Sequence, residues 1–356
     1  MRAKEQKTVF VGLSGGVDSS VVAHLLLEQH YNVVGVFIRT WQPEFIECTW
    51  RDERRDAMRV AAHLGIPFLE CDAEDAYKKG VAEYMIAEYK IGRTPNPDVM
   101  CNREVKFGVF WQFAKAHGAD FIATGHYAQL RQGSVGQALM KGVDESKDQS
   151  YFLWTLTEED LAHTLFPIGH LQKSEVRIIA ERAGLMTATK KDSQGVCFLG
   201  PLDMKDFLKH YIPSEKGKVI SEQGTQIGMH DGAMFYTLGE RHGFSITEKT
   251  PDDGAYYVIA KDIQKNTITV SQTQPFEKNS AIGVQKINLE KVVIRGPVPI
   301  KKITAAVRYH GEQYSGSLMK QEDMYMFHFD TPVLVAPGQS VVFFDGEICV
   351  GGGVVS

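Results

Sequence analysis

Long apolar runs are missing from this sequence. No stretch approaches the ~18 consecutive apolar residues that a membrane-spanning helix requires. The charged segment from Met1 to Lys7 leads into only about six apolar residues, too few for the apolar core of a secretory signal. We therefore expect a cytoplasmic protein with no membrane partner.

Cysteine is scarce and scattered. No two cysteines have the two-residue spacing of a zinc ribbon or a vicinal redox pair, and the five stand at Cys48, Cys71, Cys101, Cys197 and Cys349. An odd, dispersed set argues against a structural disulfide framework. Any functional pair must therefore be assembled by the fold, and we expect Cys48, Cys71 and Cys349 to be structural or incidental.

A basic surplus is also missing. Lys and Arg number 39 against 44 Asp and Glu, which gives a net charge of −5. Proteins that grip nucleic acid usually carry a positive balance, so any nucleic-acid site here must be a local patch. The hydrophobic fraction of 43% and the charged fraction of 23% are ordinary for a globular protein and exclude a disordered chain.

The first ~200 residues alternate short apolar runs with helical periodicity. We predict strands at 8–13, 32–38, 67–71 and 120–123, and helices at 19–30, 52–64, 75–90 and 107–117. Buried strands separated by helices indicate a parallel sheet with right-handed crossovers. The N-terminal part is therefore predicted to be α/β.

The composition changes after about residue 205. Short alternating runs predict strands at 256–260, 267–270, 302–308, 325–329 and 340–344. Strands of this length with turns between them, Asp345-Gly346 among them, are typical of small β-barrels. With a linker near residue 280, we expect a catalytic domain at 1–204, a small β-rich domain at 205–280 and a β-barrel domain at 281–356.

The segment Gly12–Ser20 follows the first predicted strand and opens a helix. Its paired glycines let the backbone approach an anion, and the helix N-terminus adds partial positive charge. It lacks the lysine of a Walker A loop and the G-x-G-x-x-G spacing of a dinucleotide loop, which disfavours a hydride-transfer cofactor. An ordinary Gly-rich turn is the plain alternative. The string Ser14–Ser19 resembles the loop of ATP pyrophosphatases, which cleave ATP between its α and β phosphates.

Two further loops contain candidate catalytic residues. Residues 94–103 hold Asp98 and Cys101 in a proline-fixed segment, where Arg103 and Lys106 would favour a thiolate at Cys101 and Asp98 could move a proton. The alternative is a surface proline turn with an inert cysteine. Residues 190–199 place Cys197 after a glycine on a polar, partly cationic loop, where its pKa would fall, or else as an ordinary buried thiol.

With these segments together, the chain resembles the bacterial tRNA-specific 2-thiouridylases. The match runs from about residue 8 to residue 355 and is carried by the strings at 94–102, 123–127, 147–152, 190–198 and 336–352. The resemblance implies an ATP pyrophosphatase domain followed by two small, mainly β domains, the last barrel-like. It also implies ATP-dependent 2-thiolation of the wobble uridine of tRNA, with Mg²⁺ assisting.

The resemblance implies a role for particular residues. The predicted catalytic residues are Asp98, Cys101 and Cys197. The predicted ATP contacts are Gly12, Leu13, Ser14, Gly15, Gly16, Val17, Asp18, Ser19, Ile38 and Gly125. The predicted tRNA contacts are Asn96, Pro97, Asp98, His126, Lys147, Asp148, Gln149, Arg308, Tyr309 and Gln339. Without the resemblance, Lys147-Asp148 reads as a solvated turn, Tyr309 as a core residue, Gln339 as part of a turn and His126 as a satisfied histidine at a sheet end.

In the implied mechanism, ATP adenylates the uridine O2 and a persulfide on Cys197, loaded by an upstream sulfur carrier or cysteine desulfurase, attacks C2. Cys101 then resolves the intermediate and forms a disulfide with Cys197. Because a disulfide requires Cα atoms within ~7 Å, we expect one cysteine loop to move, and the thiols to be too far apart, or the Cys197 loop displaced, without tRNA.

One position departs from the family: Glu240 stands where glutamine is usual, which puts a negative charge near any RNA face. Two competing hypotheses remain. An amidotransferase-type ligase would share the phosphate loop but give no role to a cysteine pair. A non-catalytic nucleotide-binding module would bind ATP without releasing AMP or pyrophosphate.

Overall fold

The computed structural model describes residues 6–46, 50–133, 136–192, 195, 197, 203–247, 254–274 and 282–356. Cys48 and most of the predicted linker lie outside these residues. The chain forms two compact units. The first unit comprises Met1–Ala82, Pro97–Pro201 and Glu347–Val350, and the second comprises Glu83–Asn96, Leu202–Gly346 and Gly351–Ser356.

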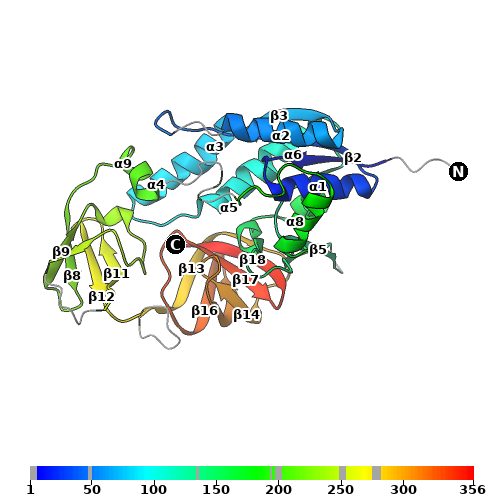
Figure 1. The fold of residues 1–356 in the computed structure, drawn as a ribbon. Coiled ribbons are helices and arrows are strands. Elements are labelled where there is room, and N and C mark those ends of the chain that lie inside the picture. Colours follow the sequence, from blue (N-terminus) through cyan, green and yellow to red (C-terminus); the bar gives the residue numbers. More distant parts are fainter. Residues whose placement is uncertain are drawn as a thin grey trace. The chain divides into compact units, whose positions relative to one another are not determined.

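The first unit is built on a parallel five-stranded sheet (Figure 1). Its order is β3-β2-β1-β4-β7, with bounds β1 Thr8–Gly12, β2 Asn32–Arg39, β3 Phe68–Asp72, β4 Phe121–Ala123 and β7 Thr164–Leu165. β1 pairs with both β2 and β4, for instance Val9 with Val33 and with Phe121. The predicted parallel sheet is confirmed, and β1 and β4 end side by side at its carboxyl edge.

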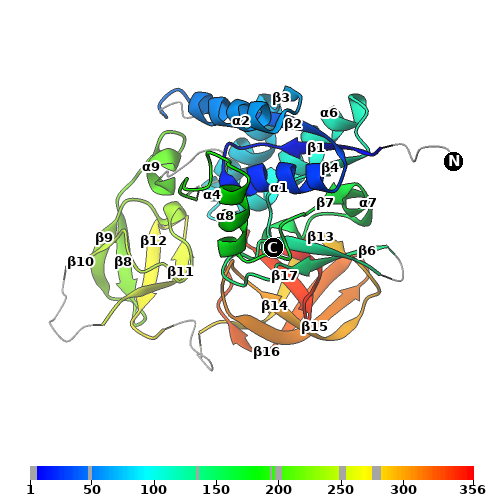
Figure 2. The same cartoon turned by 45° about the vertical axis from the view of Figure 1, so that its right-hand side comes forward.

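Helices α1 (Val17–Glu28), α2 (Trp50–Leu64) and α8 (Lys173–Arg182) share one apolar core with β1 and β2. Helical spacing of small and branched residues builds this core, since Val21, Ala57 and Val176 are all fully buried in it. Figures 1 and 2 both draw α8 beside α1. This unit also contains η3 (Ser150–Leu153), α7 (Glu158–Ala162) and the helices described next, apart from the segment 84–90, which belongs to the second unit.

Two predicted helices are differently built. The segment 75–90 is not one regular helix but α3 (Glu74–Tyr77), a π-helical stretch η1 (Lys78–Glu83) and α4 (Tyr84–Lys90). A Cβ on Gly80 would lie 2.8 Å from Glu104 Cγ, so the glycine admits that side chain. The helix predicted at 107–117 begins earlier, with α5 (Pro97–Cys101) and a second π-helical stretch η2 (Asn102–Val109) before α6 (Phe110–Ala116).

The sequence analysis missed the hairpin of β5 (Ala128–Gln132) and β6 (Gln137–Lys141), which leaves the sheet after β4. It pairs with β18 through Met140 and Ile348, both in the first unit. Because Ala128 is fully buried while its hairpin alternates only weakly, the strand signal is faint.

The second unit contains a small β-sheet and a barrel. The sheet has the order β10-β9-β8-β12-β11, with bounds β8 Gly217–Ser221, β9 Gln226–His230, β10 Ser245–Ile246, β11 Tyr257–Asp262 and β12 Thr267–Ser271, and η4 (Ala233–Phe235) and α9 (Met204–Lys209) complete this part. The barrel closes because β13 pairs with both β16 and β18 (Figure 2). Its bounds are β13 Val284–Ile294, β14 Ile300–Ala306, β15 Gln313–Gln321, β16 Met324–Val333, β17 Ser340–Asp345 and β18 Ile348–Val355.

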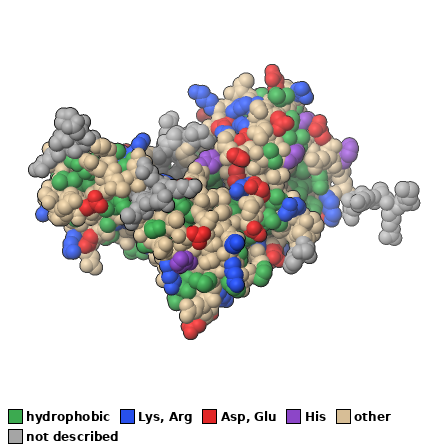
Figure 3. Space-filling model, turned by 90° about the horizontal axis from the view of Figure 1, so that it is seen from below, with side chains coloured by type: hydrophobic (Ala, Val, Ile, Leu, Met, Phe, Trp, Pro, Cys, Tyr) green, Lys and Arg blue, Asp and Glu red, His purple; other side chains and the backbone are tan. Residues whose placement is uncertain are grey.

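The predicted fold class is therefore confirmed, including the barrel-like C-terminal region. Among helices in the described residues, none combines the length and the apolar character needed to cross a bilayer. On the face seen in Figure 3, acidic and basic side chains are interspersed.

Candidate active site of the first unit

The phosphate loop connects β1 to α1 at the carboxyl edge of the sheet. Gly15 has a φ of +72°, and a Cβ there would lie 2.7 Å from the Glu53 carbonyl oxygen, so glycine is required twice over. The hydroxyls of Ser19 and Ser20 donate to the Gly16 carbonyl at 3.2 and 2.7 Å and tie the loop to the first turn of α1. The loop thus has the conformation expected of an anion cradle at a helix N-terminus, and its role in holding the phosphates of ATP stays a prediction.

Two predicted ATP contacts border this loop. A Cβ on Gly12 would lie 3.6 Å from Ile38 Cδ1, so the β2 side chain lies against the loop's first residue. Gly125 follows β4, and a Cβ there would come within 3.0 Å of Asp18 Cβ and of the Ser19 amide nitrogen. The adjacent ends of β1 and β4 therefore bring Gly12, Ile38 and Gly125 to one place.

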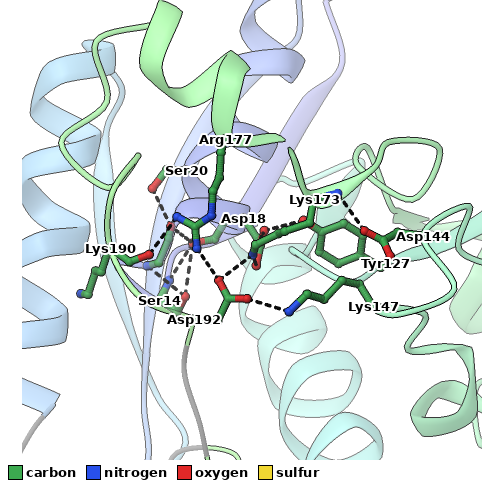
Figure 4. A network of polar contacts seen from close by, with 12 residues as sticks. Ser14, Asp18, Ser20, Tyr127, Asp144, Lys147, Lys173, Arg177, Lys190 and Asp192 are labelled. Carbon is green, nitrogen blue, oxygen red and sulfur yellow. Dashed lines mark hydrogen bonds and ion pairs between the residues drawn. The ribbon is translucent and has the colours of Figure 1, made fainter. Parts of the chain in front are cut away.

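Asp18, on the first turn of α1, is held from two sides. Lys173 Nζ donates to its two carboxylate oxygens at 2.7 and 2.8 Å, and the Tyr127 hydroxyl donates to Oδ1 at 2.8 Å (Figure 4). The backbone amide of Lys173 is in turn bound by Asp144 at 2.9 Å. Lys173, Tyr127 and Asp18, which come from three segments distant in the sequence, thus meet at the loop.

Asp192 gathers three cations beside Asp18. Its carboxylate lies 2.8 Å from Lys147 Nζ, 3.0 Å from Lys173 Nζ and 2.8 Å from an Arg177 guanidinium nitrogen (Figure 4). Burial opposes ionisation, but the hydrogen bonds from Lys147 and Lys173 outweigh it and lower the pKa of Asp192 from 3.8 to about 2. Lys190 joins the same region by donating to the Gly15 carbonyl at 3.0 Å and to Asp56 at 2.8 Å.

The two predicted catalytic cysteines meet although they lie 96 positions apart. Cys101 Sγ and Cys197 Sγ are 3.5 Å apart, and both thiols are free. Cys101, the last residue of α5, is fully buried, whereas Cys197 is half-buried. The expectation that the thiols are too far apart without tRNA is wrong, because hydrogen bonds hold the backbone of Cys197 in place. The alternative expectation, a displaced Cys197 loop, falls mostly on residues outside those described.

Those bonds come from α5 and α3. The Cys197 amide donates to Asp98 Oδ1 at 2.9 Å, and the Tyr77 hydroxyl donates to the Cys197 carbonyl at 2.8 Å. Burial raises the pKa of the Asp98 carboxyl, against the Cys197 amide and Lys106 that favour its charged form. Asp98 is therefore suited to exchange a proton closer to neutrality than an exposed aspartate.

The two thiols differ in acidity. Burial raises the pKa of Cys101 well above its usual value, whereas the hydrogen bond from Cys101 lowers the pKa of Cys197, aided by Lys106 and opposed by burial. Cys197 is therefore the more readily ionised of the two thiols, which is opposite to the prediction that favoured a thiolate at Cys101. Arg103 does not serve either thiol, since its guanidinium pairs with Glu104 at 2.6 Å.

His126 is buried beside this pair and is neutral, because burial and Lys106 lower its pKa well below the usual value. Lys106 Nζ lies 3.5 Å from His126 Nε2, and Thr124 Oγ1 lies 2.8 Å from Nδ1. An ammonium can only donate, so Nε2 accepts and Nδ1 carries the ring proton.

The other predicted tRNA contacts are distributed over both units. Pro97 begins α5 in the first unit, and Asn96 ends a segment of the second. Asp148 accepts from Gly142 and Ser150 and so braces its own turn, whereas the Gln149 side chain accepts from the Tyr127 amide and ties this turn to the segment after β4.

In the second unit, Arg308 is exposed beyond β14 and Tyr309 stacks on His310 with ring centroids 3.9 Å apart. The Gln339 carbonyl accepts from the Val355 amide at 2.9 Å. Glu240 turns its carboxylate onto the Thr237 amide at 3.0 Å, and burial raises its pKa. The negative charge expected at an RNA face is thus engaged within its own turn.

Sequence reasoning missed several residues of the site. They are Asp56, Tyr77, Lys173, Arg177 and the ion-pairing role of Asp192. Lys190 and Asp192 stand in the string already singled out around Cys197, and their charge was the available signal. Lys173 lies 155 positions from Asp18 and shares no local pattern with it.

Comparisons with known proteins agree with this geometry. The family model described as "tRNA methyl transferase HUP domain" matches residues 7–201, a PRC-barrel model of the same name series matches 205–272, and an "Aminomethyltransferase beta-barrel domain" model matches 285–355. The chain is 44% identical to the tRNA-specific 2-thiouridylase MnmA of Streptococcus equi subsp. zooepidemicus over 100% of this chain and 96% of that protein. The enzyme of the same name from Stutzerimonas stutzeri is likewise 44% identical, with the same coverage.

The site thus belongs to a nucleotide-binding HUP domain that carries a cysteine pair. The chain is a member of the tRNA-specific 2-thiouridylase family.

Proposed function

We propose that this protein is a tRNA-uridine 2-sulfurtransferase that uses ATP to convert the wobble uridine into 2-thiouridine. One observation carries the proposal: two consecutive residues join the phosphate loop to the cysteine pair. Gly125 packs on Asp18 and Ser19, and His126 contacts Lys106, which hydrogen-bonds Cys197. A base bound at this junction lies between the nucleotide and the sulfur donor.

The first step activates the base. The uridine O2 attacks the α-phosphorus of ATP and pyrophosphate leaves, while the loop residues Gly12–Ser19 hold the phosphates through backbone N–H groups and hydroxyls. Ile38 and Gly125 border the adenosine. Mg²⁺ fits this loop in its usual mode of one or two carboxylates plus substrate phosphates. Asp18 would hold it, where Lys173 now neutralises the carboxylate, and the ion would offset charge on the leaving pyrophosphate.

The second step transfers sulfur. The terminal sulfur of a Cys197 persulfide attacks C2 and AMP leaves. Cys101, deprotonated with Asp98 as proton acceptor, then attacks Cys197 Sγ, and the electron pair of the broken S–S bond moves to the sulfur on C2. This leaves 2-thiouridine and a Cys101–Cys197 disulfide, which an external thiol must reduce. The 3.5 Å separation of the two sulfurs supports this pairing.

We assign the flipped base to Asn96, Pro97, Asp98 and His126, since a base must leave the anticodon stack to be modified. Lys147, Asp148, Gln149, Arg308, Tyr309 and Gln339 would contact the rest of the tRNA. The ranges of the family models support a division after residues 204 and 280.

An upstream sulfur carrier or cysteine desulfurase would supply the persulfide sulfur. The requirement to reopen the disulfide fits the cytoplasm, where thiol systems keep cysteines reduced.

Thiolation of purified tRNA with ATP and a persulfide donor tests the function, with nucleosides identified by mass spectrometry. We expect 2-thiouridine, AMP and pyrophosphate from the parent protein and no 2-thiouridine from Cys197→Ser, although pyrophosphate is still released by adenylation. Cys349→Ala, a buried thiol outside the pair, should keep full activity. ADP as the main product would contradict the loop assignment, and full thiolation activity of Cys197→Ser would contradict the two-cysteine mechanism.

A further inference from the structure

One lysine lies against both cysteines. Lys106 belongs to η2, which continues the helical stretch of α5, and its ammonium hydrogen-bonds Cys197. The π-helical turn widens the repeat to about five residues, which places Lys106 on the same side of the stretch as Cys101. In a regular helix Lys106 and Cys101 would lie on different faces, because such a helix aligns residues three or four positions apart.

Among the described residues, four ionisable groups face Cys197 or Lys106 from the elements packed there: Tyr77, Asp98, Cys101 and His126. His126 is neutral and accepts from the ammonium, so it orients Lys106 without competing for the charge. Burial opposes the Lys106 ammonium, but the neighbouring sulfurs raise its pKa on balance, so it remains a cation.

We propose that Lys106 is a catalytic cation that serves the two sulfurs in turn, first Cys197 as it is loaded and then Cys101 as it resolves the intermediate. This inference rests on the proposed sulfur transfer. In the free enzyme Cys101 is the thiol that donates to Cys197, and Lys106 adds a second donor to the same sulfur. The two donors together hold Cys197 as the thiolate that sulfur loading requires.

The negative charge of the thiolate then passes from Cys197 to Cys101 in the course of the reaction. The Cys197 thiolate attacks the terminal sulfur of the donor's persulfide, and the donor leaves as a thiolate. Once the Cys197 sulfur is bonded to the transferred sulfur and C2 has been attacked, Cys197 carries no charge. The ammonium is then available to Cys101, whose proton passes to Asp98 and whose thiolate displaces the transferred sulfur from Cys197. The same ammonium thus favours the thiolate form of Cys197 before loading and the thiolate form of Cys101 after it.

The pH dependence of alkylation tests this role without tRNA or ATP. The free enzyme is treated with iodoacetamide over a range of pH, and mass spectrometry follows the peptide that contains Cys197. We expect a midpoint below the ordinary thiol value of about 8.5 in the parent. In Lys106→Met the midpoint should rise by at least one pH unit, and in Lys106→Arg it should stay within half a unit of the parent.

Arg103→Met is the matched control, because it removes the neighbouring cation that pairs with Glu104 and should leave the midpoint unchanged. Circular dichroism checks that each variant is folded. A parent midpoint at or above about 8.5 overturns the proposal even if Lys106→Met does not fold. An equal midpoint in folded Lys106→Met and in the parent also overturns it.

Two further measurements separate this inference from the proposed function. If sulfur transfer occurs, Lys106→Met should slow single-turnover formation of 2-thiouridine at least tenfold even when Cys197 is persulfidated beforehand, while AMP formation stays near the parent rate. An unaffected rate from the preloaded variant contradicts the second role of Lys106. Absence of 2-thiouridine from the parent, with AMP still formed, contradicts the proposed function instead.

Discussion

Asp192 illustrates how one carboxylate organises the catalytic unit. Asp192 stands on the segment that leads to Cys197, and its oxygens pair with Lys147 from the turn after β6 and with Lys173 and Arg177 from α8. Arg177 also donates to the Ala188 and Lys190 carbonyls at 2.8 and 3.0 Å, so the segment is anchored by backbone as well as charge. The same carboxylate therefore links the phosphate loop region to the chain that carries the thiolate.

We predict that Asp192→Asn lowers the free energy of unfolding by about 2 kcal/mol at pH 7, the value of a pKa depressed from 3.8 to about 2. A depressed pKa stabilises the folded state above the unfolded pKa, so the difference from the parent should narrow below about pH 4. Urea denaturation at several pH values between 7 and 3 measures it.

Asp52→Asn serves as the control, because Asp52 pairs with Arg55 on the surface, with 75% of its side chain exposed. Its removal should cost only a few tenths of a kcal/mol. Equal free energies of unfolding for Asp192→Asn and the parent at pH 7 would show that the ion pairs of this carboxylate do not stabilise the fold.

At the scale of elements, the turn between β1 and α1 is fixed by contact with α2. The carbonyl of Glu53 approaches so closely that only a glycine fits at position 15. Gly65, at the end of α2, has a similar φ of +66° but faces open space. Substitutions at these two positions therefore distinguish the cost of backbone strain from the cost of a steric clash.

We predict that Gly15→Ala costs about 2–3 kcal/mol of stability, and Gly65→Ala about 1 kcal/mol, since only the first adds a clash to the strained backbone. Gly15→Ala should also slow AMP formation at least tenfold, because the loop amides no longer converge on the phosphates. Thermal denaturation and nucleotide analysis on the same samples measure both effects. Equal losses of stability in the two variants would mean that α2 can shift away from position 15 at no measurable cost.

At the scale of the whole molecule, the net charge of −5 opposes a polyanionic substrate. Interspersed charges on the surface in Figure 3 leave binding to local groups such as the exposed Arg308. Phosphate contacts by arginine and lysine position RNA, while base and shape contacts select it.

We predict that tRNA affinity falls as salt rises, with a linear dependence of log K on log salt, because bound cations on the RNA are released. Arg308→Ala should reduce the slope by about one, while Arg308→Lys should keep it. Filter binding between 50 and 300 mM salt, a range of about sixfold, measures the slope. A flat dependence in the parent would mean that the RNA face is not electrostatic.

The sequence by itself determined the strands β1 to β4, the helices α1 and α2 between them, the phosphate loop and the two cysteine segments. These features are local: β-branched runs record burial, and paired glycines before a helix record a backbone that must approach an anion. The strings around Asp98, Cys101 and Cys197 were sufficient to predict the family, which the comparisons confirm. The roles assigned to the individual residues stay predictions.

Only the tertiary structure decided which thiol is the more acidic and what surrounds it. Arg103 and Lys106 are equivalent in sequence, but the π-helical turn directs Lys106 toward the sulfurs and leaves Arg103 with Glu104. Likewise Lys173 reaches Asp18 because α8 packs on α1. Periodicity reports which face of an element is buried, whereas acidity depends on the distance to charges brought by other elements, and packing alone sets that distance.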